Sequence, residues 1–133
     1  MEITKCTDDD WMITLLGQEG FPINRTGIHS CANIKTDYGF FSIRLEHGYP
    51  RLVHFIVEKD KRSFSNSLDQ FNAFTELMVI TGSPAFIVEV PREKPELEKA
   101  IQFIGGKTPY QVIDGDKVYL IPTGYRRKKH HGR

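Results

Sequence analysis

Residues 51–78 contain the clearest pattern of apolar and polar positions in the chain. A nearly continuous apolar run at 52–57 predicts a strand buried on both faces. A charged run at 58–62 follows, and then a loop of small polar residues at 63–67. We predict a helix over 67–80, because apolar side chains there recur three and four residues apart: Leu68, Phe71, Phe74, Leu77 and Met78.

A strand followed by a basic, small-residue loop and a helix is a common arrangement of anion sites. The backbone N–H groups of the loop and of the helix N-terminus point at one place, where a phosphate can bind. The serines of this loop, Ser63, Ser65 and Ser67, are also common helix N-caps. Capping is the more frequent role of such serines, and the pattern alone leaves both open.

The N-terminal half predicts two helical segments and a run of antiparallel strands. A short strand at 1–7 is followed by a helix that starts in the acidic run at Asp8 and ends near Gly17 or Gly20, and a further helical turn is expected at 26–30. Strands are expected at 31–36, 40–45 and 51–57. The turns between them, 37–39 and 47–50, are short, so these strands form a meander.

The C-terminal half adds a strand, a helix and a hairpin. Thr81 to Pro84 ends the preceding helix, and the strand at 85–90 is expected to run parallel to the one at 51–57. A helix over 94–104 has Pro95 in its first turn. Asp114 and Gly115 predict a tight hairpin turn between two short strands.

Composition and length favour one globular domain over residues 1–123. The 133 residues include 39% hydrophobic and 26% charged residues. No apolar run approaches the ~20 residues that cross a bilayer, and the N-terminus lacks a signal-peptide pattern, so we expect a cytoplasmic protein with no membrane contact. Cys6 and Cys31 lack metal-ligand spacing, so we expect free thiols and no metal.

The last ten residues, 124–133, carry an excess of positive charge. Five fixed charges lie here, so the net charge of +1 leaves about +1 − 5 = −4 on the rest of the chain. A basic tail on an acidic body predicts an arm that binds nucleic acid or another polyanion; the alternative is a solvated terminus. The predicted phosphate-binding residues are Arg126, Arg127, Lys128, Lys129 and Arg133.

The order of elements resembles the GNAT superfamily of acyl-CoA N-acyltransferases over about residues 1–122. The segments that carry the resemblance are EITKCTDDD, RLVHFIVEKDKR, and AFIVEV followed by a helix and an Asp-Gly hairpin. The resemblance implies an α+β fold: a central, mostly antiparallel twisted sheet of about seven strands with helices on both faces. It also implies acetyl-CoA as the cofactor.

In that family, an Arg/Gln-x-x-Gly-x-Gly/Ala loop binds the pyrophosphate of acetyl-CoA through backbone N–H groups. The matching run has the arginine, but serine replaces both glycines, which weakens the site if those positions need positive φ. The backbone at the end of the preceding strand binds the pantetheine arm. The cofactor-binding residues that the resemblance implies are Ile56, Val57, Arg62, Ser63, Phe64, Ser65, Asn66 and Ser67.

The family's catalytic groups have no clear match. Members often carry a Glu or His base at positions that here hold Arg51 and Val53, and His54 alternates to the opposite face. The tyrosine acid of the last helix is absent from 100–104. Three polar residues near one turn are the catalytic candidates that remain: Glu46, His47 and Tyr49.

Two functions follow from the resemblance. The first is acetyl-CoA-dependent N-acetylation of a primary amine on a small molecule or a protein, which works mainly by positioning. The second is a non-catalytic GNAT-fold protein with a protein assembly partner and a polyanion-binding tail. Short, motif-poor versions of this fold resemble proteins of tailed phages, including virion-associated ones, which makes a virion the alternative location.

Overall fold

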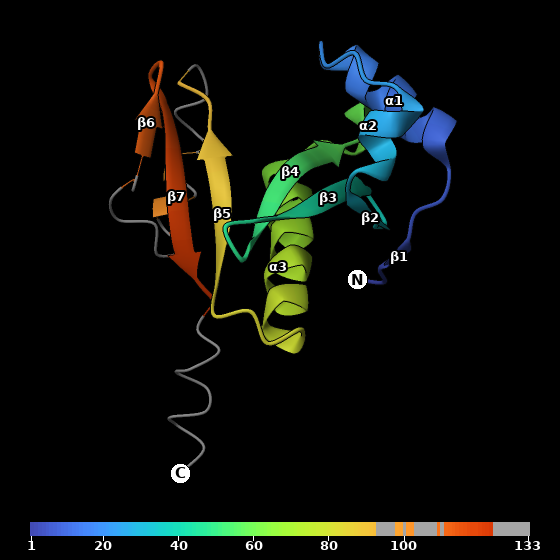
Figure 1. The fold of residues 1–133 in the computed structure, drawn as a ribbon. Helices are drawn as coiled ribbons and strands as arrows, with labels where there is room; N and C mark the ends of the chain where they lie inside the picture. The colour runs from blue at the N-terminus through green and yellow to red at the C-terminus, as the bar shows by residue number, and fades with distance from the viewer. Residues whose placement is uncertain (93–97, 100, 103–108, 110, 124–133) are drawn as a thin grey trace. The chain divides into compact units, whose positions relative to one another are not determined.

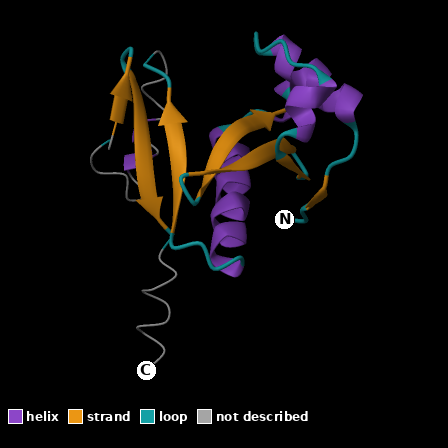
Figure 2. Cartoon of the chain, in the orientation of Figure 1, coloured by secondary structure: helices purple, strands orange, loops and turns teal. Residues whose placement is uncertain are grey.

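The computed structural model describes residues 1–92, 98–99, 101–102, 109 and 111–123. Figures 1 and 2 show its helices and strands. In chain order these are β1 (Thr4–Lys5), α1 (Asp9–Gln18), α2 (Arg25–His29), β2 (Ala32–Lys35), β3 (Gly39–Glu46), β4 (Tyr49–Val57), the 3-10 turn η1 (Lys59–Lys61), α3 (Phe64–Ile80), β5 (Ala85–Val90), β6 (Gln111–Ile113) and β7 (Asp116–Pro122).

The strands form one seven-stranded sheet in the order β1-β2-β3-β4-β5-β7-β6. The β1–β2, β2–β3, β5–β7 and β6–β7 pairs are antiparallel, and β4 and β5 are parallel through Arg51–Ile87 and Leu52–Val88. The predicted α+β class, strand number and parallel pair are therefore confirmed. The chain divides into two compact units: unit 1 is Met1–Arg44 with Val53–Leu77, and unit 2 is Leu45–Leu52 with the described residues from Met78 onward.

In unit 1, helices cover both faces of the sheet. Phe40 lies in a buried cluster with α1 and α2 residues and packs on Trp11, with 5.7 Å between ring centroids. The next residue, Phe41, packs edge-on against Phe74 of α3 at 5.5 Å. Successive strand residues point to opposite faces, so these two phenylalanines fix α1 on one face and α3 on the other.

The β3–β4 turn is tighter than predicted. His47 and Gly48 both have positive φ, 53° and 83°, which makes a two-residue turn between Glu46 and Tyr49. Such turns match the twist of the strands they join. The expectation of a turn over 47–50 is therefore wrong, and β4 starts at Tyr49. The predicted burial of β4 on both faces is also only partly correct, because its middle residues, 51–55, are half-buried.

β4 contains one more residue than the opposite stretch of β3. The two-residue turn aligns Glu46 with Tyr49, so an unbroken ladder would bring Tyr38 opposite Val57. Instead, the N–H of Glu58 donates to the Tyr38 carbonyl at 2.8 Å. The extra residue is a β-bulge, a feature that re-aims a strand and is common beside functional sites.

Gln70 of α3 makes hydrogen bonds to the strands close to this bulge. Its side chain is fully buried, and its amide nitrogen donates to the carbonyls of Ile56 (3.0 Å) and Phe40 (3.3 Å). Thr36 donates its hydroxyl to the Gln70 amide oxygen at 2.5 Å. The network joins β3, β4, α3 and Thr36, the residue after β2, and it leaves no side-chain polar atom of Gln70 without a partner.

In unit 2, β5 pairs with β7 along six residues, and its side chains are mostly buried. Asp114 and Gly115 have φ of 51° and 86°, which confirms the predicted hairpin turn. The Arg92 side chain stabilises this turn by donating a hydrogen bond to the Asp114 carbonyl at 3.0 Å. Most of the predicted helix over 94–104 lies outside the described residues. Within that range the structure describes 98–99 and 101–102, and these four residues are helical. Among the described helices, none is long and apolar enough to cross a membrane.

We predict that Gly39→Ala lowers the free energy of unfolding by about 3 kcal/mol, because overpacking a buried site forces the backbone to move. A Cβ at this buried position would lie 2.0 Å from the Ile56 carbonyl oxygen and 3.1 Å from the Val57 Cα. Gly17→Ala is the matched control. Its Cβ would meet nothing within 4 Å in the exposed part of α1, so we expect no loss or a gain of up to about 1 kcal/mol. Urea unfolding of both variants measures the difference, and equal stabilities would contradict the bulge geometry.

Candidate functional site

The N-terminus of α3 begins three residues earlier than predicted, at Phe64. Ser63 is the reason: its hydroxyl oxygen accepts from the Asn66 N–H at 3.0 Å, and its carbonyl accepts from the Ser67 N–H at 3.0 Å. Ser63 is therefore the N-cap, and four of the predicted loop residues form the first helical turn. The capping interpretation is correct for this serine.

Three backbone N–H groups at this helix end have no acceptor among the described residues: those of Ser63, Phe64 and Ser65. All three residues are exposed, and the Phe64 side chain is 78% exposed. The first turn of a 17-residue helix carries partial positive charge. The arrangement offers a phosphate several aligned donors.

The two serines that replace glycines of the family motif have ordinary backbone angles. Of the described non-glycine residues, only His47 and Asp114 have positive φ. Ser65 and Ser67 lie in α3 with right-handed helical geometry, so a Cβ costs nothing there. The expected weakening of the loop by serine has no basis in this backbone.

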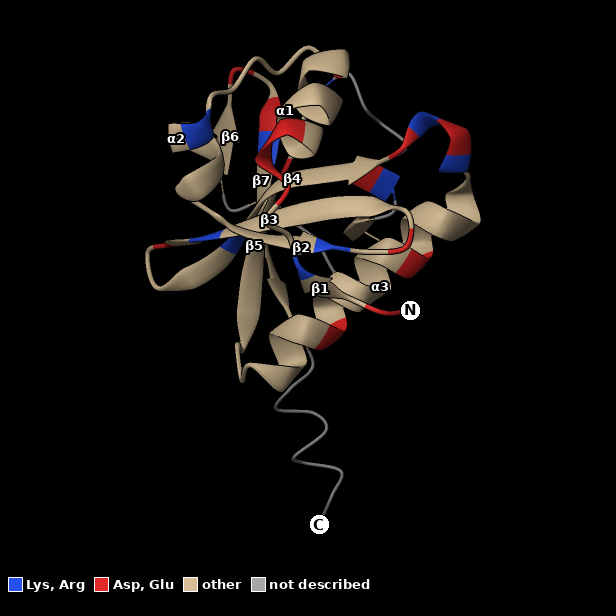
Figure 3. Ribbon diagram, turned by 90° about the vertical axis from the view of Figure 1, so that its right-hand side faces the viewer, with Lys and Arg blue, Asp and Glu red and all other residues tan. Residues whose placement is uncertain are grey.

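Arg62 is held by two partners within unit 1. Its Nε donates to the Val57 carbonyl at 3.0 Å, and its Nη2 lies 2.8 Å from a Glu19 carboxylate oxygen. Asn66 adds a bond from its side-chain nitrogen to the Lys61 carbonyl at 2.7 Å. The guanidinium thus ties the end of β4 to the start of α3. Figure 3 shows the Lys and Arg residues of the connection between β4 and α3 in blue and its acidic residues in red.

The carbonyls of Ile56 and Val57, which the resemblance assigns to pantetheine, already accept hydrogen bonds. Ile56 accepts from Gln70 and Val57 accepts from Arg62. Both side chains are buried, so a ligand could contact these residues only through the backbone. Displacing either side-chain donor would cost about one hydrogen bond, roughly 1 kcal/mol.

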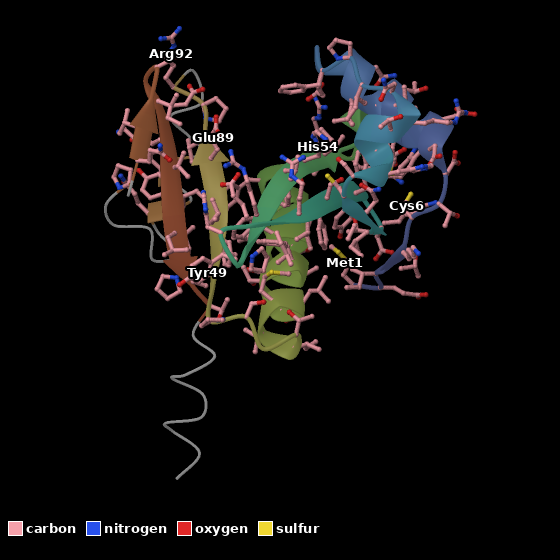
Figure 4. The ribbon with its side chains drawn as sticks, viewed as in Figure 1. Met1, Cys6, Tyr49, His54, Glu89 and Arg92 are labelled. Carbon is pink, nitrogen blue, oxygen red and sulfur yellow. The ribbon has the colours of Figure 1, made fainter. Side chains whose placement is uncertain are left out.

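A second polar cluster lies in unit 2. Arg51 donates to a Glu46 carboxylate oxygen at 2.7 Å and also pairs with Glu89 of β5. Burial lowers the pKa of Arg51, but the hydrogen bonds and charges of the two carboxylates outweigh it and raise the pKa above its ordinary value. Figure 4 labels Glu89 and Tyr49. Tyr49 is partly buried, and His47 is exposed on the turn.

Sequence analysis missed Glu89 as a functional candidate. It is the only charged residue in the apolar run AFIVEV, and a lone charge in a buried strand needs a partner. That signal was available. What the sequence could not provide is the parallel register of Arg51 with Ile87, which brings the partner within reach.

No family model matches the sequence, and the search of curated proteins found no match. Solved structures do match. The ribosomal-protein-S18-alanine N-acetyltransferase from Escherichia coli superposes with a TM-score of 0.73 at 11% identity, over 92% of this chain and 93% of that one. An AtaT-AtaR complex bound to DNA gives a TM-score of 0.67 at 12% identity, over 98% and 99% of the two chains. AtaTR bound with AcCoA gives 0.59 at 13% identity, over 97% of each chain.

This chain has the GNAT fold. Identities of 11–13% show the fold alone, so the roles of individual residues rest on the geometry of this chain. In this GNAT-fold protein, the family's usual base positions hold the ion-paired Arg51 and the apolar Val53. Among the described residues no cluster of three metal-ligating side chains occurs. The five basic residues of the tail lie outside the described residues.

We predict that the half-buried His54 of β4 (Figure 4) makes this protein less stable in mild acid. Burial lowers the pKa of His54, and the charge of Arg44 lowers it further. At pH values below about 6.5, the ordinary pKa that His54 has in the unfolded chain, the unfolded chain binds a proton more readily than the folded chain. The free energy of unfolding therefore rises with pH through this window and falls as His54 is protonated.

His54→Gln should therefore lose less stability than the wild type between pH 7 and pH 5. His47→Asn is the matched control, because it removes an exposed histidine and asparagine tolerates positive φ. Thermal unfolding across this pH range gives the answer. If His47→Asn reduces the dependence of stability on pH and His54→Gln does not, His54 is not the group that causes the loss of stability in acid.

Proposed function

We propose that this protein is an acetyl-CoA-dependent N-acetyltransferase that acts on a primary amine. The observation that carries the proposal is the exposed N-terminus of α3, where the N–H groups of Ser63, Phe64 and Ser65 have no acceptor among the described residues. This helix end follows β4 after the short turn η1, in the order that the resemblance gives to the pyrophosphate-binding segment. AtaTR, a structure of the same fold, was crystallised with AcCoA.

The residues present fit a pyrophosphate. Aligned N–H donors and the helix dipole favour an anion, Ser63 and Ser65 are exposed, and no strained backbone angle is required. Arg62 would act by holding the loop, through Val57 and Glu19, more than by contacting phosphate. Asn66 and Ser67 would complete the first helical turn behind the anion.

When bound, acetyl-CoA would supply the acetyl group as a thioester, with the CoA thiolate as leaving group and the amine nitrogen as acceptor. The residues of this chain would handle the protons. Glu46 and Glu89, the two carboxylates that pair with Arg51, would attract a substrate ammonium, and one of them would accept its proton. Tyr49 and His47 lie in the same unit as these carboxylates and carry groups that could protonate a thiolate.

A second function is supported by different observations. Arg51 and Val53 occupy the family's base positions, and the Ile56 and Val57 carbonyls already have side-chain donors. These features favour a GNAT-fold protein that binds without catalysis, as a structural or host-interacting protein. Its basic tail would bind phosphates of a polyanion in a salt-sensitive way. AtaT-AtaR, again of the same fold, forms a protein complex that binds DNA.

The first test separates binding from folding. Ser65→Asp places a negative charge in the first turn of α3, where it favours the helix by up to about 1 kcal/mol but repels a phosphate. We expect unchanged or higher thermal stability and at least about tenfold weaker CoA binding by isothermal titration. Asn72→Asp, an exposed change of the same charge on the same helix, should leave CoA affinity unaltered. Equal CoA affinity in Ser65→Asp and wild type would remove this helix end from the site.

The second test addresses catalysis. With acetyl-CoA and a panel of polyamines and lysine peptides, thiol release should report turnover, and Glu89→Gln should lower kcat by about 100-fold without changing acetyl-CoA affinity. Glu46→Gln shows which of the two carboxylates is the base. Glu76→Gln, on the exposed side of α3, is the control and should retain full activity. Tight CoA binding with no turnover in the wild type would favour the non-catalytic function.

A further inference from the structure

A polar hollow of about 380 Å³ lies on unit 1, and none of the serines at the start of α3 lines it. Its wall combines one aromatic ring with charges of both signs. The ring is that of Trp11. The charged lining groups are the carboxylates of Asp8, Asp37 and Glu58 and the ammonium groups of Lys35 and Lys61.

The Trp11 ring is fixed in place. Its Nε1–H donates to a Glu58 carboxylate oxygen at 3.2 Å, and the ring packs on Phe40 at 5.7 Å between centroids. The hydrogen bond and the buried phenylalanine hold the edge and the body of the indole. The hollow therefore contains a preformed aromatic surface.

A cation already lies over this ring. The Lys35 ammonium nitrogen is 5.1 Å from the ring centroid, within the range of cation–π attraction. The Lys61 ammonium is paired with other groups of the lining: it lies 2.8 Å from a Glu58 carboxylate oxygen and 3.3 Å from the Asp37 carbonyl. Lys35 extends from the last residue of β2 on a flexible stem, so it can leave the ring at little cost.

The charges of the hollow favour a second cation. Three carboxylates and two ammonium groups give a net charge of about −1 with Lys35 in place. When Lys35 swings out to solvent, the charge that remains beside the ring is about −2. A positively charged ligand would gain both the ring and these carboxylates.

We propose that this hollow binds alkylammonium groups, and that Lys35 takes the ligand's place over Trp11 when none is bound. The ligand class is a primary or quaternary ammonium, carried by a small molecule or by a lysine side chain. The proposal stands apart from acetyl transfer, because it concerns residues that bind neither cofactor nor carbonyl carbon in the proposed reaction. It therefore predicts binding in the absence of acetyl-CoA.

Trp11 is the only tryptophan of the chain, so its fluorescence and its single indole N–H resonance report on this hollow. The probe is tetramethylammonium chloride, added to the full-length protein at constant ionic strength with sodium chloride as the balance. We expect a saturable change in both signals. Lys35→Met, which removes the internal competitor, should tighten binding by about two- to fivefold, the equivalent of one exposed cation–π contact. Glu58→Gln should weaken it.

Three controls test whether the response depends on the positive charge of the ligand and on Lys35. Neopentyl alcohol, a neutral molecule of similar shape, should give no saturable change, and Lys5→Met, an exposed lysine of β1, should bind like the wild type. Lys35→Gln serves as a second competitor-free variant, and the N–H spectrum shows whether either variant is folded. No saturation in folded Lys35 variants, an equal response to the alcohol, or a saturable response to sulfate instead would overturn the proposal.

Discussion

The hydrogen bonds of Gln70 are the interaction on which unit 1 depends. Ile56 lies in the buried end of β4, and a buried carbonyl without a donor costs about 1–3 kcal/mol. The Gln70 amide supplies that donor, reaches the Phe40 carbonyl as well, and accepts from Thr36. Thr36 in turn accepts from the N–H of Gly39. Because the network is fully buried and each member has a partner, it holds α3 and two strands in one arrangement.

This anchor also sets the position of the proposed cofactor site. Gln70 and Ser63 are seven residues apart, or about two helical turns, so fixing the rotation of α3 at Gln70 fixes the direction of the capping serine. Arg62 then joins the Val57 carbonyl, just after the bulge, to Glu19 at the end of α1. The N–H groups of the first turn, which have no acceptor in the described part of the chain, are thus positioned by buried contacts several residues away.

The sequence predicted the elements whose signals are local, and it missed the contacts that depend on distant partners. The Asp114-Gly115 turn, the parallel strand at 85–90 and the acidic start of α1 follow from turn chemistry, chain order and capping. His47-Gly48 forms the same kind of turn, yet positive φ is uncommon for any residue other than glycine, and the turn was predicted to extend over 47–50. Gln70 gave no signal at all, because a glutamine between apolar helix positions indicates solvent unless the bulge opposite it is known. The early start of α3 required the Ser63 bond.

The two regions proposed for acetyl transfer differ in how far they are preorganised. At the start of α3, donors with no acceptor among the described residues are exposed on a rigid helix end, so an anion would meet a preorganised surface. In unit 2, the carboxylates of Glu46 and Glu89 already share the Arg51 guanidinium, so proton acceptance requires one of them to loosen a charge-assisted bond. Each such bond is worth about 1.5–3 kcal/mol, comparable to a 10- to 100-fold change in rate. In the proposed reaction, cofactor binding would therefore survive where turnover is slow, and the rate of acetyl transfer would depend on how readily an acceptor ammonium replaces Arg51 as the partner of these carboxylates.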